Sequence, residues 1–402
     1  MNKISALSGS IVALATPFRD HAVDANTLAV LCERQIACGT AALVACGSTG
    51  EASSLSMPEY FEIVRLVVAA SDGRIPVIAG CGASATEGAV ECARLAASAG
   101  ADALLCAPPA YVKPTQEGIF AHVRALAHAT NLPIMLYDVP GRVGVSIADE
   151  TIARLFERSL IVAIKDATGD LARPPRLRAL CGEGLLQMSG DDATAAAYRA
   201  MGGAGCVSVT ANVAPALCAA MHHAWESGHL TRFATLRDLL AELHCTLFLE
   251  SNPIPLKAAL TMLRLCGPDL RLPLTGATRL TRARLAAALA QIIGYEEREA
   301  REFLAAAPKQ PVVASQCHVS CPLKRPVRLS GTEDRHKAVQ NTPLYETQEF
   351  CVTRSPLPEG YDCPACKDEP APYDYRQCRG GAEGHQIDDL ANDKKGRHVC
   401  AD

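Results

Sequence analysis

The sequence is poor in aromatic residues and contains no long uncharged apolar run. Only 4% of its 402 residues are aromatic, and Trp225 is the single tryptophan. A packed core must therefore consist mainly of Ala, Leu, Val and Ile, which is typical of helices layered on buried parallel strands. No stretch approaches the roughly 18 uncharged residues of a membrane-spanning helix, so we expect a soluble chain without a membrane partner.

An excess of either charge is also missing. The chain has 39 Lys and Arg against 43 Asp and Glu, a formal net charge of −4, and no polybasic run. Proteins that bind the phosphates of nucleic acids or of anionic lipids rely on clustered positive charge. We therefore expect no nucleic-acid partner.

The cysteines do not form the pattern of a disulfide framework. Eleven of the 18 are scattered singly through residues 1–300, several of them within apolar runs. This usage indicates buried thiols in a reducing compartment and predicts a cytoplasmic protein. Lys3 and the apolar run that ends near Ala15 leave a signal peptide as an alternative, although the same run is equally typical of a first buried strand.

Eight short apolar runs alternate with segments of helical apolar spacing. The predicted strands are residues 11–15, 42–46, 76–79, 103–106, 133–137, 161–164, 185–188 and 205–209. Eight successive βα units of this size predict an α/β fold, a (β/α)8 TIM barrel. A doubly wound open sheet ranks second, because it usually has fewer strands and no GxGxxG motif follows the first one.

The composition changes twice along the chain. We assign residues 1–214 to the catalytic barrel and residues 215–304, which have helical periodicity without strand runs, to a C-terminal helical domain. In residues 308–402 only 14 of 95 residues are Ile, Leu, Val, Phe or Met. That content is too low for a packed core, so residues 305–402 are predicted to be a largely disordered tail.

The tail contains half of a possible zinc site. Cys363 and Cys366 form a Cys-x-x-Cys unit, which can supply two of the four ligands of a tetrahedral zinc ion. A second matching unit is missing, so an unstructured extension is the favoured alternative. Whether Cys363 and Cys366 bind zinc stays open at this stage.

Chemically reactive side chains stand where predicted strands end, which is where a TIM barrel builds its active site. Lys165 directly follows the sixth predicted strand, and burial there favours the neutral amine that attacks a carbonyl to form a Schiff base. The alternative is a lysine at the rim that pairs with Asp166. These residues predict a nucleophile at the mouth of the barrel or, failing that, a surface ion pair.

Two further strand ends carry groups that suit an anionic substrate. The segment GSTGE (47–51) offers backbone N–H groups for a carboxylate, although it is also ordinary turn chemistry. Tyr137 ends the fifth predicted strand and Arg142 follows on its loop. A guanidinium there suits bidentate binding of a carboxylate, and the alternative is a surface arginine paired with Asp138.

These residues belong to longer motifs, and through them the chain resembles a known family over residues 9–295. It is similar to the pyruvate-dependent class I aldolases of the N-acetylneuraminate lyase superfamily, and within them to the dihydrodipicolinate synthase branch. The motifs that carry the resemblance are GSTGE (47–51), RIPVIAGCGAS (74–84), PAYVKP (109–114), LYDVPGRVG (136–144), IKDATGD (164–170), SGDDA (189–193), GCVSVTANV (205–213) and NPIPLK (252–257).

The resemblance implies a role for each matching residue. Lys165 condenses with pyruvate and needs no metal or organic cofactor. Tyr137 moves protons through the hydroxyl of Ser48 to Tyr111, a tyrosine supplied by a neighbouring subunit. The substrate-binding residues are, by the same resemblance, Thr49, Arg142, Gly190 and Val207.

The resemblance also implies the reaction and the assembly. The enamine of pyruvate attacks aspartate semialdehyde, in the diaminopimelate pathway to lysine, and the enzyme is a homo-oligomer, a tetramer built from dimers. Two alternatives stay open, because a fold alone does not assign a substrate. The chain is either a related lyase of keto-deoxy sugar acids or sialic acid, or a non-catalytic barrel used for binding.

Regulation is where the sequence departs from the family. Members that are inhibited by lysine hold it with polar side chains at a dimer interface, including a glutamate. The matching positions of this chain are Met57, Tyr60, Ser84, Gly88 and Ala110. Without the carboxylate an ammonium group is desolvated with nothing to compensate, so we expect insensitivity to lysine unless Glu87 takes over that role.

Overall fold

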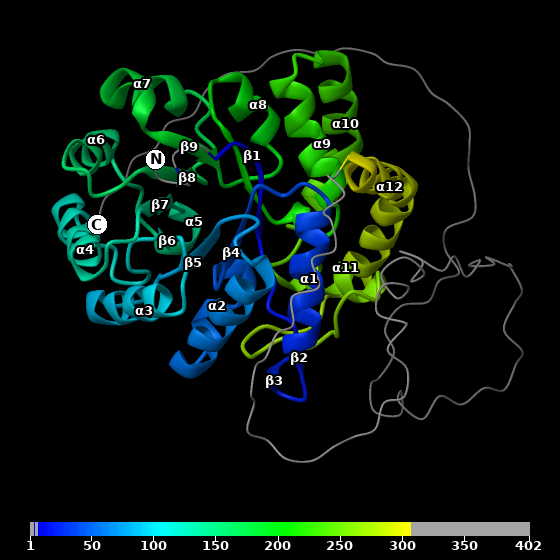
Figure 1. Cartoon of the computed structure of the whole chain (residues 1–402), viewed down its shortest axis with the longest axis horizontal. Helices are drawn as coiled ribbons and strands as arrows, with labels where there is room; N and C mark the ends of the chain where they lie inside the picture. Colours follow the sequence, from blue (N-terminus) through cyan, green and yellow to red (C-terminus); the bar gives the residue numbers. More distant parts are fainter. Residues whose placement is uncertain (1–3, 5–6, 307–402) are drawn as a thin grey trace, which may run out of the picture. The chain divides into compact units, whose positions relative to one another are not determined.

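The protein is a closed barrel of eight parallel strands, described by a computed structural model for residue 4 and residues 7–306 (Figure 1). The predicted TIM barrel is therefore confirmed. Around the barrel the strands follow one another in the order β1, β4, β5, β6, β7, β8, β9 and β10, and β10 pairs again with β1. Their bounds are Gly9–Ala13, Ala42–Ala45, Val77–Gly80, Ala103–Cys106, Ile134–Asp138, Ala163–Asp166, Leu186–Ser189 and Gly205–Ser208.

The barrel strands are buried on both faces, which explains their continuous apolar runs. One set of side chains fills the interior of the barrel, including Ile11, Ile78, Met135, Met188 and Val207. A second, larger set packs between the strands and the surrounding helices. The barrel therefore has a solid core, and an open site can form only at its rim.

Helices surround the barrel and alternate with its strands. In chain order they are α1 (Ala25–Ala37), α2 (Met57–Ser71), α3 (Thr86–Ser98), α4 (Gln116–Ala129), α5 (Pro140–Val143), α6 (Asp149–Glu157), α7 (Arg173–Cys181), α8 (Ala195–Ala200) and α9 (Pro215–Glu226). A small antiparallel pair, β2 (Phe18–Arg19) and β3 (Ala22–Val23), precedes α1. None of the helices described has the length and apolar character that a membrane span requires.

Local sequence signals fix where several helices begin. Ser56 caps α2 and forms a capping box with Glu59, and Thr115 caps α4 by accepting a hydrogen bond from the Gly118 N–H. Pro215 starts α9, where a missing N–H is not needed. These starts leave the residues before each helix as loops at the carboxyl ends of the strands.

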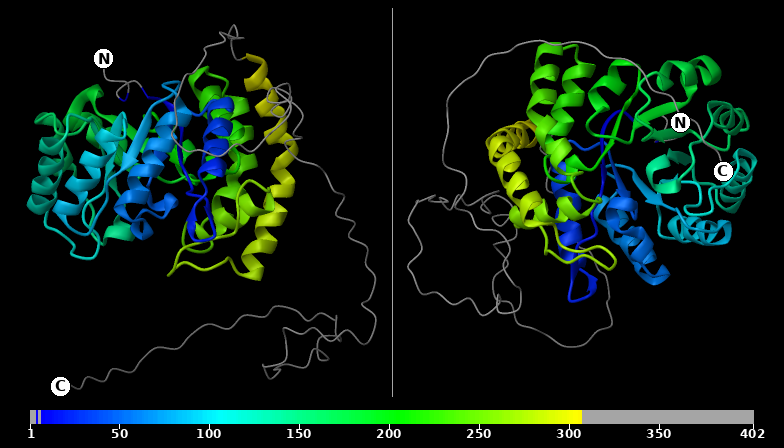
Figure 2. Two further views of the ribbon diagram at one scale, coloured as in Figure 1. Left: turned by 60° about the horizontal axis from the view of Figure 1, so that its bottom comes forward. Right: turned by 180° about the vertical axis from the view of Figure 1, so that it is seen from behind.

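Three more helices follow α9: α10 (Leu230–Thr246), α11 (Ile254–Met262) and α12 (Arg279–Ala306). The long helix α12 packs against α9, α10 and α11 (Figure 2). The loop between α10 and α11 brings residues 248–252 to the barrel mouth, where Phe248 and Asn252 line a cavity. The domain boundaries at residues 214 and 304 stay predictions. Residues 305 and 306 of the predicted tail belong to α12, and residues 307–402 lie outside the described residues.

The strands β7 and β8 end later than the sequence pattern predicts. Asp138 and Asp166 extend them as buried strand residues, where the pattern placed Tyr137 and Ile164 last. Both carboxylates bind the guanidinium of Arg173, which allows charged residues to stay in a buried strand. Lys165 therefore lies inside a strand rather than after it.

Candidate active site

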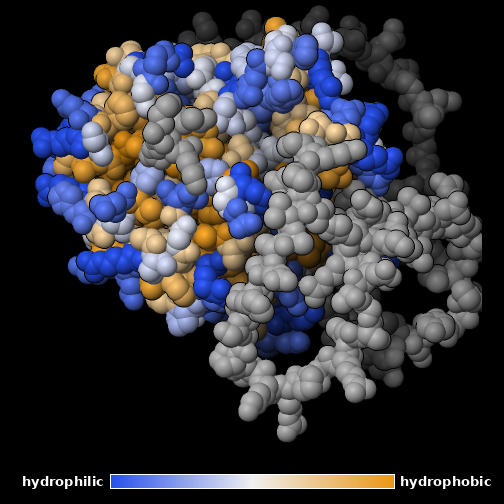
Figure 3. Space-filling model, in the orientation of Figure 1, coloured by the Kyte–Doolittle hydropathy of each residue, from blue (hydrophilic) through white to orange (hydrophobic). Residues whose placement is uncertain are grey.

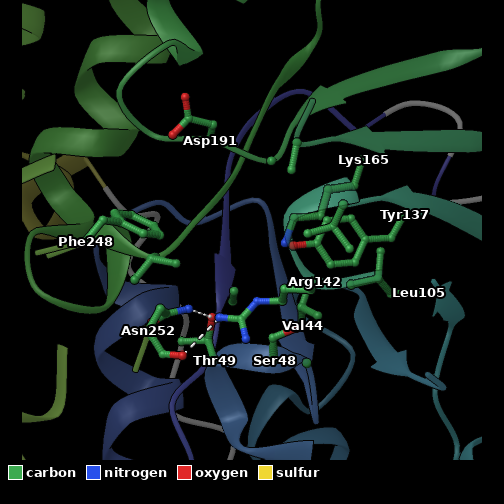
Figure 4. A pocket seen from close by; sticks show the side chains of 16 residues that line it. Val44, Ser48, Thr49, Leu105, Tyr137, Arg142, Lys165, Asp191, Phe248 and Asn252 are labelled. Atoms are coloured by element: carbon green, nitrogen blue, oxygen red, sulfur yellow. Dashed lines mark hydrogen bonds between the residues drawn. The ribbon is translucent and has the colours of Figure 1, made fainter. Parts of the chain in front are cut away.

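A cavity of about 200 Å³ opens at the carboxyl ends of the barrel strands. Six of the eight predicted site residues line it: Ser48, Thr49, Tyr137, Arg142, Lys165 and Gly190. They come from four different strand ends and their loops (Figure 4). The fold thus brings together residues that are up to 142 positions apart in the sequence, from Ser48 to Gly190.

Lys165 and Tyr137 form the centre of the cavity. They are direct partners in the register of β7 and β8, and neighbouring parallel strands direct the side chains of such partners to the same face. The Lys165 Nζ lies 4.2 Å from the centroid of the Tyr137 ring, and the two residues are 5% and 9% exposed. A buried amine beside a phenol can attack a carbonyl and exchange protons with the adduct.

The structure decides against the two ion pairs that were the alternatives for Lys165 and Arg142. The carboxylate of Asp166 accepts hydrogen bonds from the Thr168 backbone and hydroxyl, and that of Asp138 lies 2.7 Å from an Arg173 nitrogen. Lys165 and Arg142 therefore do not serve as the partners of these acids. Both remain directed to the cavity.

The loop after β4 forms the second wall of the cavity. Thr49 is 3% exposed and its hydroxyl accepts a hydrogen bond from the Asn252 amide, at 3.0 Å. Ser48 is half-buried beside it and belongs to the short turn Ser48–Gly50. Two hydroxyl groups at one loop suit a small carboxylate that is held close to the lysine amine.

A buried ion pair supports this loop from behind. Lys257 Nζ lies 2.6 Å from a Glu51 carboxylate oxygen and donates to the Asp269 carbonyl at 2.7 Å, and both side chains are 1% exposed. Burial lowers the pKa of Lys257, which the partner Glu51 counteracts. Because its amine is already held by two acceptors outside the cavity, Lys257 is a structural lysine and Lys165 is the candidate nucleophile.

Arg142 stands at the open edge of the cavity on α5. Arg142 is exposed, and its Nη2 donates a hydrogen bond to the Asn252 carbonyl at 3.0 Å. Asn252 thus contacts Arg142 with its backbone and Thr49 with its side chain, as the dashed lines of Figure 4 show. The remaining N–H groups of the guanidinium are suited to a second carboxylate.

The other predicted residues occupy different positions. Gly190 lies against Lys165, and an added Cβ would come within 3.1 Å of its Cε. Val207 is buried in the interior of the barrel and does not line the cavity, whereas Val209 does. Tyr111 is 94% exposed and lies outside the cavity of its own chain. The roles of these residues stay predictions.

Sequence reasoning missed several lining residues, among them Asp191, Phe248 and Asn252. Asp191 stands in the quoted segment SGDDA, directly after Gly190. Asn252 begins the segment NPIPLK, which the pattern marks as a turn between helices. A polar residue in an otherwise apolar turn was the available signal, but nothing local places that turn beside Arg142.

Metal ligands do not gather in the described part of the chain. Residues 7–306 contain no group of three His, Cys, Asp or Glu side chains that could hold a metal ion. Cys363 and Cys366, the predicted half of a zinc site, lie outside the described residues.

Comparison with known proteins finds relatives along most of the described chain. The model of the dihydrodipicolinate synthetase family matches residues 6–292. A 4-hydroxy-tetrahydrodipicolinate synthase of Rhodospirillum centenum is 50% identical over 281 residues, which are 70% of this chain and 97% of the relative. One from Hyphomonas neptunium is 50% identical over 284 residues, with the same shares covered.

A solved structure is similar as well. The chloride-inhibited dihydrodipicolinate synthase of Acinetobacter baumannii, complexed with pyruvate, has a TM-score of 0.69 and 43% sequence identity to this chain. The match covers 71% of this chain and 99% of that one. The similarity therefore spans almost the entire length of these relatives.

Proposed function

Because the chain belongs to the dihydrodipicolinate synthetase family and is a lyase of the class I aldolase type, we propose that it is a 4-hydroxy-tetrahydrodipicolinate synthase. The reaction condenses pyruvate with aspartate semialdehyde. The family forms a covalent Schiff base between pyruvate and a lysine and uses no external cofactor. The observation that carries the assignment to this site is the buried Lys165 amine over the Tyr137 ring, 4.2 Å from its centroid.

The proposed first half-reaction takes place between Lys165 and pyruvate. The neutral amine attacks the keto carbon, and loss of water leaves an iminium ion. The pyruvate carboxylate is held by the hydroxyls of Ser48 and Thr49, the latter fixed by Asn252. Tyr137 gives a proton to the departing hydroxyl and takes it back in later steps, with Ser48 as the next group in the relay.

The second half-reaction joins the two substrates. Loss of a methyl proton converts the iminium ion to an enamine, whose carbon attacks the aldehyde of aspartate semialdehyde. Arg142 holds the carboxylate of that substrate through the guanidinium N–H groups that Asn252 does not occupy. Gly190 and Asp191 also line the cavity. The amine of the second substrate then displaces Lys165 and releases the cyclic product.

Insensitivity to lysine is the second part of the proposal. None of the five positions carried over from lysine-inhibited members has a carboxylate. One of them, Tyr60, is 4% exposed, and its hydroxyl is buried without a hydrogen-bond partner in the described residues, so this side chain occupies space rather than offering a solvated polar contact. Glu87 is the nearby acidic residue and is exposed in the first turn of α3.

An inhibition curve at saturating pyruvate tests this part. We expect no loss of activity at millimolar lysine. Half-loss below about 1 mM, an affinity near −4 kcal/mol, contradicts it. If wild-type enzyme is inhibited and Glu87→Gln is not, Glu87 supplies the carboxylate after all.

Assembly and location complete the proposal: a homo-oligomer, a tetramer built from dimers, in the cytoplasm. Tyr111 is 94% exposed with a φ of 74°, and Val112 beside it is 59% exposed. A non-glycine residue rarely keeps a positive φ without a reason, and a phenol held outward suits the site of a neighbouring subunit. Exposed apolar residues are interspersed with charged ones on the face drawn in Figure 3. The eleven described cysteines are free thiols, as in a reducing compartment.

Sedimentation with activity measured on the same samples tests the assembly. We expect inactivation when dilution produces monomers, since Tyr111 must then be lost from the site. A fully active monomer contradicts this role of Tyr111.

The substrate assignment is tested by a coupled assay. Pyruvate and aspartate semialdehyde are supplied together with a dihydrodipicolinate reductase, and cleavage of keto-deoxy sugar acids and of sialic acid is assayed in parallel. We expect turnover only in the first assay. Cleavage of a sugar acid without synthase turnover contradicts the proposal, and so does the absence of all activity, which favours a binding protein.

A further inference from the structure

Two buried carboxylates lie directly behind Lys165 and Tyr137, the catalytic pair of the proposed reaction. Asp138 follows Tyr137, Asp166 follows Lys165, and the two acids are also register partners in β7 and β8. Side chains alternate along a strand, so the two acids point away from the cavity, toward the helices. They are 0% and 3% exposed.

One guanidinium bridges both acids. Arg173, the first residue of α7, is 3% exposed, and its Nη1 donates to Asp138 Oδ2 at 2.7 Å and to Asp166 Oδ1 at 3.4 Å. Its other nitrogens are used as well: Nε donates to Asp149 at 2.8 Å, and Nη2 donates to the Ile147 carbonyl at 2.6 Å. The four acceptors fix the orientation of the guanidinium plane.

The bridge counteracts a repulsion that acts on the two strand ends. Two carboxylates side by side in a buried position repel each other. Burial raises the pKa of Asp138, although Arg173 favours its charged form. The second oxygen of Asp138 is buried without a partner in the described residues. Asp138 is therefore held through Oδ2 alone, by Arg173 and by the Ile147 N–H at 3.2 Å.

The spacing of the catalytic pair depends on the same two strand ends. Tyr137 and Lys165 are each one residue before an acid that Arg173 holds, so a displacement of either acid tilts the residue before it. The pyruvate carboxylate site, at Ser48 and Thr49, belongs to a different strand end and does not contact Arg173.

We propose that Arg173 is a positioning residue for the reaction: by binding Asp138 and Asp166 together, it fixes the Tyr137 ring against the Lys165 amine. This inference rests on the proposed function of the same cavity. Loss of the bridge slows proton transfer and Schiff-base formation while pyruvate binding is retained. A misplacement near 1 Å lowers such rates by about 100-fold.

Three variants of the full-length chain test the bridge. Arg173→Lys keeps a positive charge but cannot reach all four acceptors, and Asp138→Ala removes the link to β7 alone. We expect kcat to fall by about 10- to 100-fold in both, with the KM for pyruvate within about 2-fold of the wild-type value. Asp138→Asn keeps an oxygen that accepts the Arg173 N–H, so kcat is expected to return toward the wild-type value.

Arg176→Lys is the matched control. Arg176 lies one turn later on α7 and also binds Asp149, at 2.9 Å, together with Asp170, at 2.8 Å, but it does not contact either of the two bridged acids. We expect wild-type kcat for this variant. If Arg173→Lys fails to fold, the two Asp138 variants decide. Wild-type kcat in Asp138→Ala, or equal losses in Asp138→Ala and Asp138→Asn, overturns the proposal.

A second readout separates this proposal from the choice of aldehyde substrate. The rate at which pyruvate and borohydride modify Lys165 requires no aldehyde. We expect slower modification in Arg173→Lys and Asp138→Ala, even if wild-type protein shows no synthase turnover. Wild-type modification rates in both variants contradict the positioning role, whereas missing turnover of the wild type alone contradicts only the proposed function.

Discussion

We predict that Lys165 keeps its position only because residue 190 has no side chain. Gly190→Ala is the smallest change that tests this. A Cβ at residue 190 would stand 2.8 Å from the Ala167 Cβ and 3.1 Å from the Lys165 Cε. Ordinary contacts between carbon atoms lie at about 3.5 to 4.0 Å. The new methyl group therefore requires residues 190 and 167 to move apart by nearly 1 Å. Because Ala167 has no side chain that can rotate away, its backbone must shift, and this shift displaces Lys165, two residues before it, whose Cε also lies too close to the new Cβ.

The magnitude follows from this displacement. An error of about 1 Å in the position of a reacting group lowers the rate by about 100-fold, and overpacking of this kind destabilises a fold by about 1–3 kcal/mol. We expect Gly190→Ala to fold, to unfold at a lower urea concentration, and to form the pyruvate adduct about 100-fold more slowly. The assay is the rate of borohydride-dependent modification by pyruvate, measured on protein shown to be folded by circular dichroism.

Gly141→Ala serves as the control, because nothing lies within 4 Å of an added Cβ at that position and its φ is not in the left-handed region. We expect wild-type rates for it. If Lys165 of Gly190→Ala is modified at the wild-type rate, the reasoning is refuted, since the reaction would then tolerate the displacement. Equal losses in the two variants refute it as well.

Three further predictions concern Tyr137, Arg142 and His222, a buried histidine of α9. Tyr137→Phe keeps the ring beside the Lys165 amine but removes the hydroxyl, so we expect kcat to fall by about 10²- to 10⁴-fold in the coupled assay, and a loss below about 5-fold contradicts the proton-transfer role. Arg142→Ala is expected to raise the KM for aspartate semialdehyde while pyruvate trapping is unchanged, and equal losses in both measurements contradict a role limited to the second substrate. Burial lowers the pKa of His222 to about 4, so protonation is easier in the unfolded chain. The contribution of neutral His222 to the free energy of unfolding is complete above about pH 6.5. It is lost as the pH falls from 6.5 to 4, which lowers that free energy by at most about 3 kcal/mol. The free energy of unfolding, measured with urea across this pH range, should fall less in His222→Gln than in wild type and in His223→Gln, a control at the exposed neighbouring histidine. An equal fall in all three proteins contradicts the prediction.

The predicted residues that line the cavity share one property: each lies at the end of a barrel strand or on the loop that follows it. Lys165 and Tyr137 end apolar runs, and a barrel places such ends on one rim, so their meeting follows from the period of the pattern. Their direct register then explains the contact between amine and ring.

Two of the residues that were missed, Asn252 and Arg173, depend on contacts between distant parts of the chain. Asn252 is 110 positions from Arg142, and only the packing of the loop between α10 and α11 brings them together. Arg173 stands in a charged segment that resembles an exposed helix start, yet it is 3% exposed because two strand ends need its charge. No local signal distinguishes such a buried arginine from its exposed neighbour Arg176.

The central claim is that Lys165 forms a Schiff base with pyruvate in this cavity. The direct measurement is mass spectrometry of the protein after treatment with pyruvate and borohydride, followed by peptide mapping. We predict one reduced pyruvyl group per chain, located on Lys165, and none in Lys165→Ala. No adduct, or an adduct on Lys257, the second buried lysine among the described residues, contradicts the account.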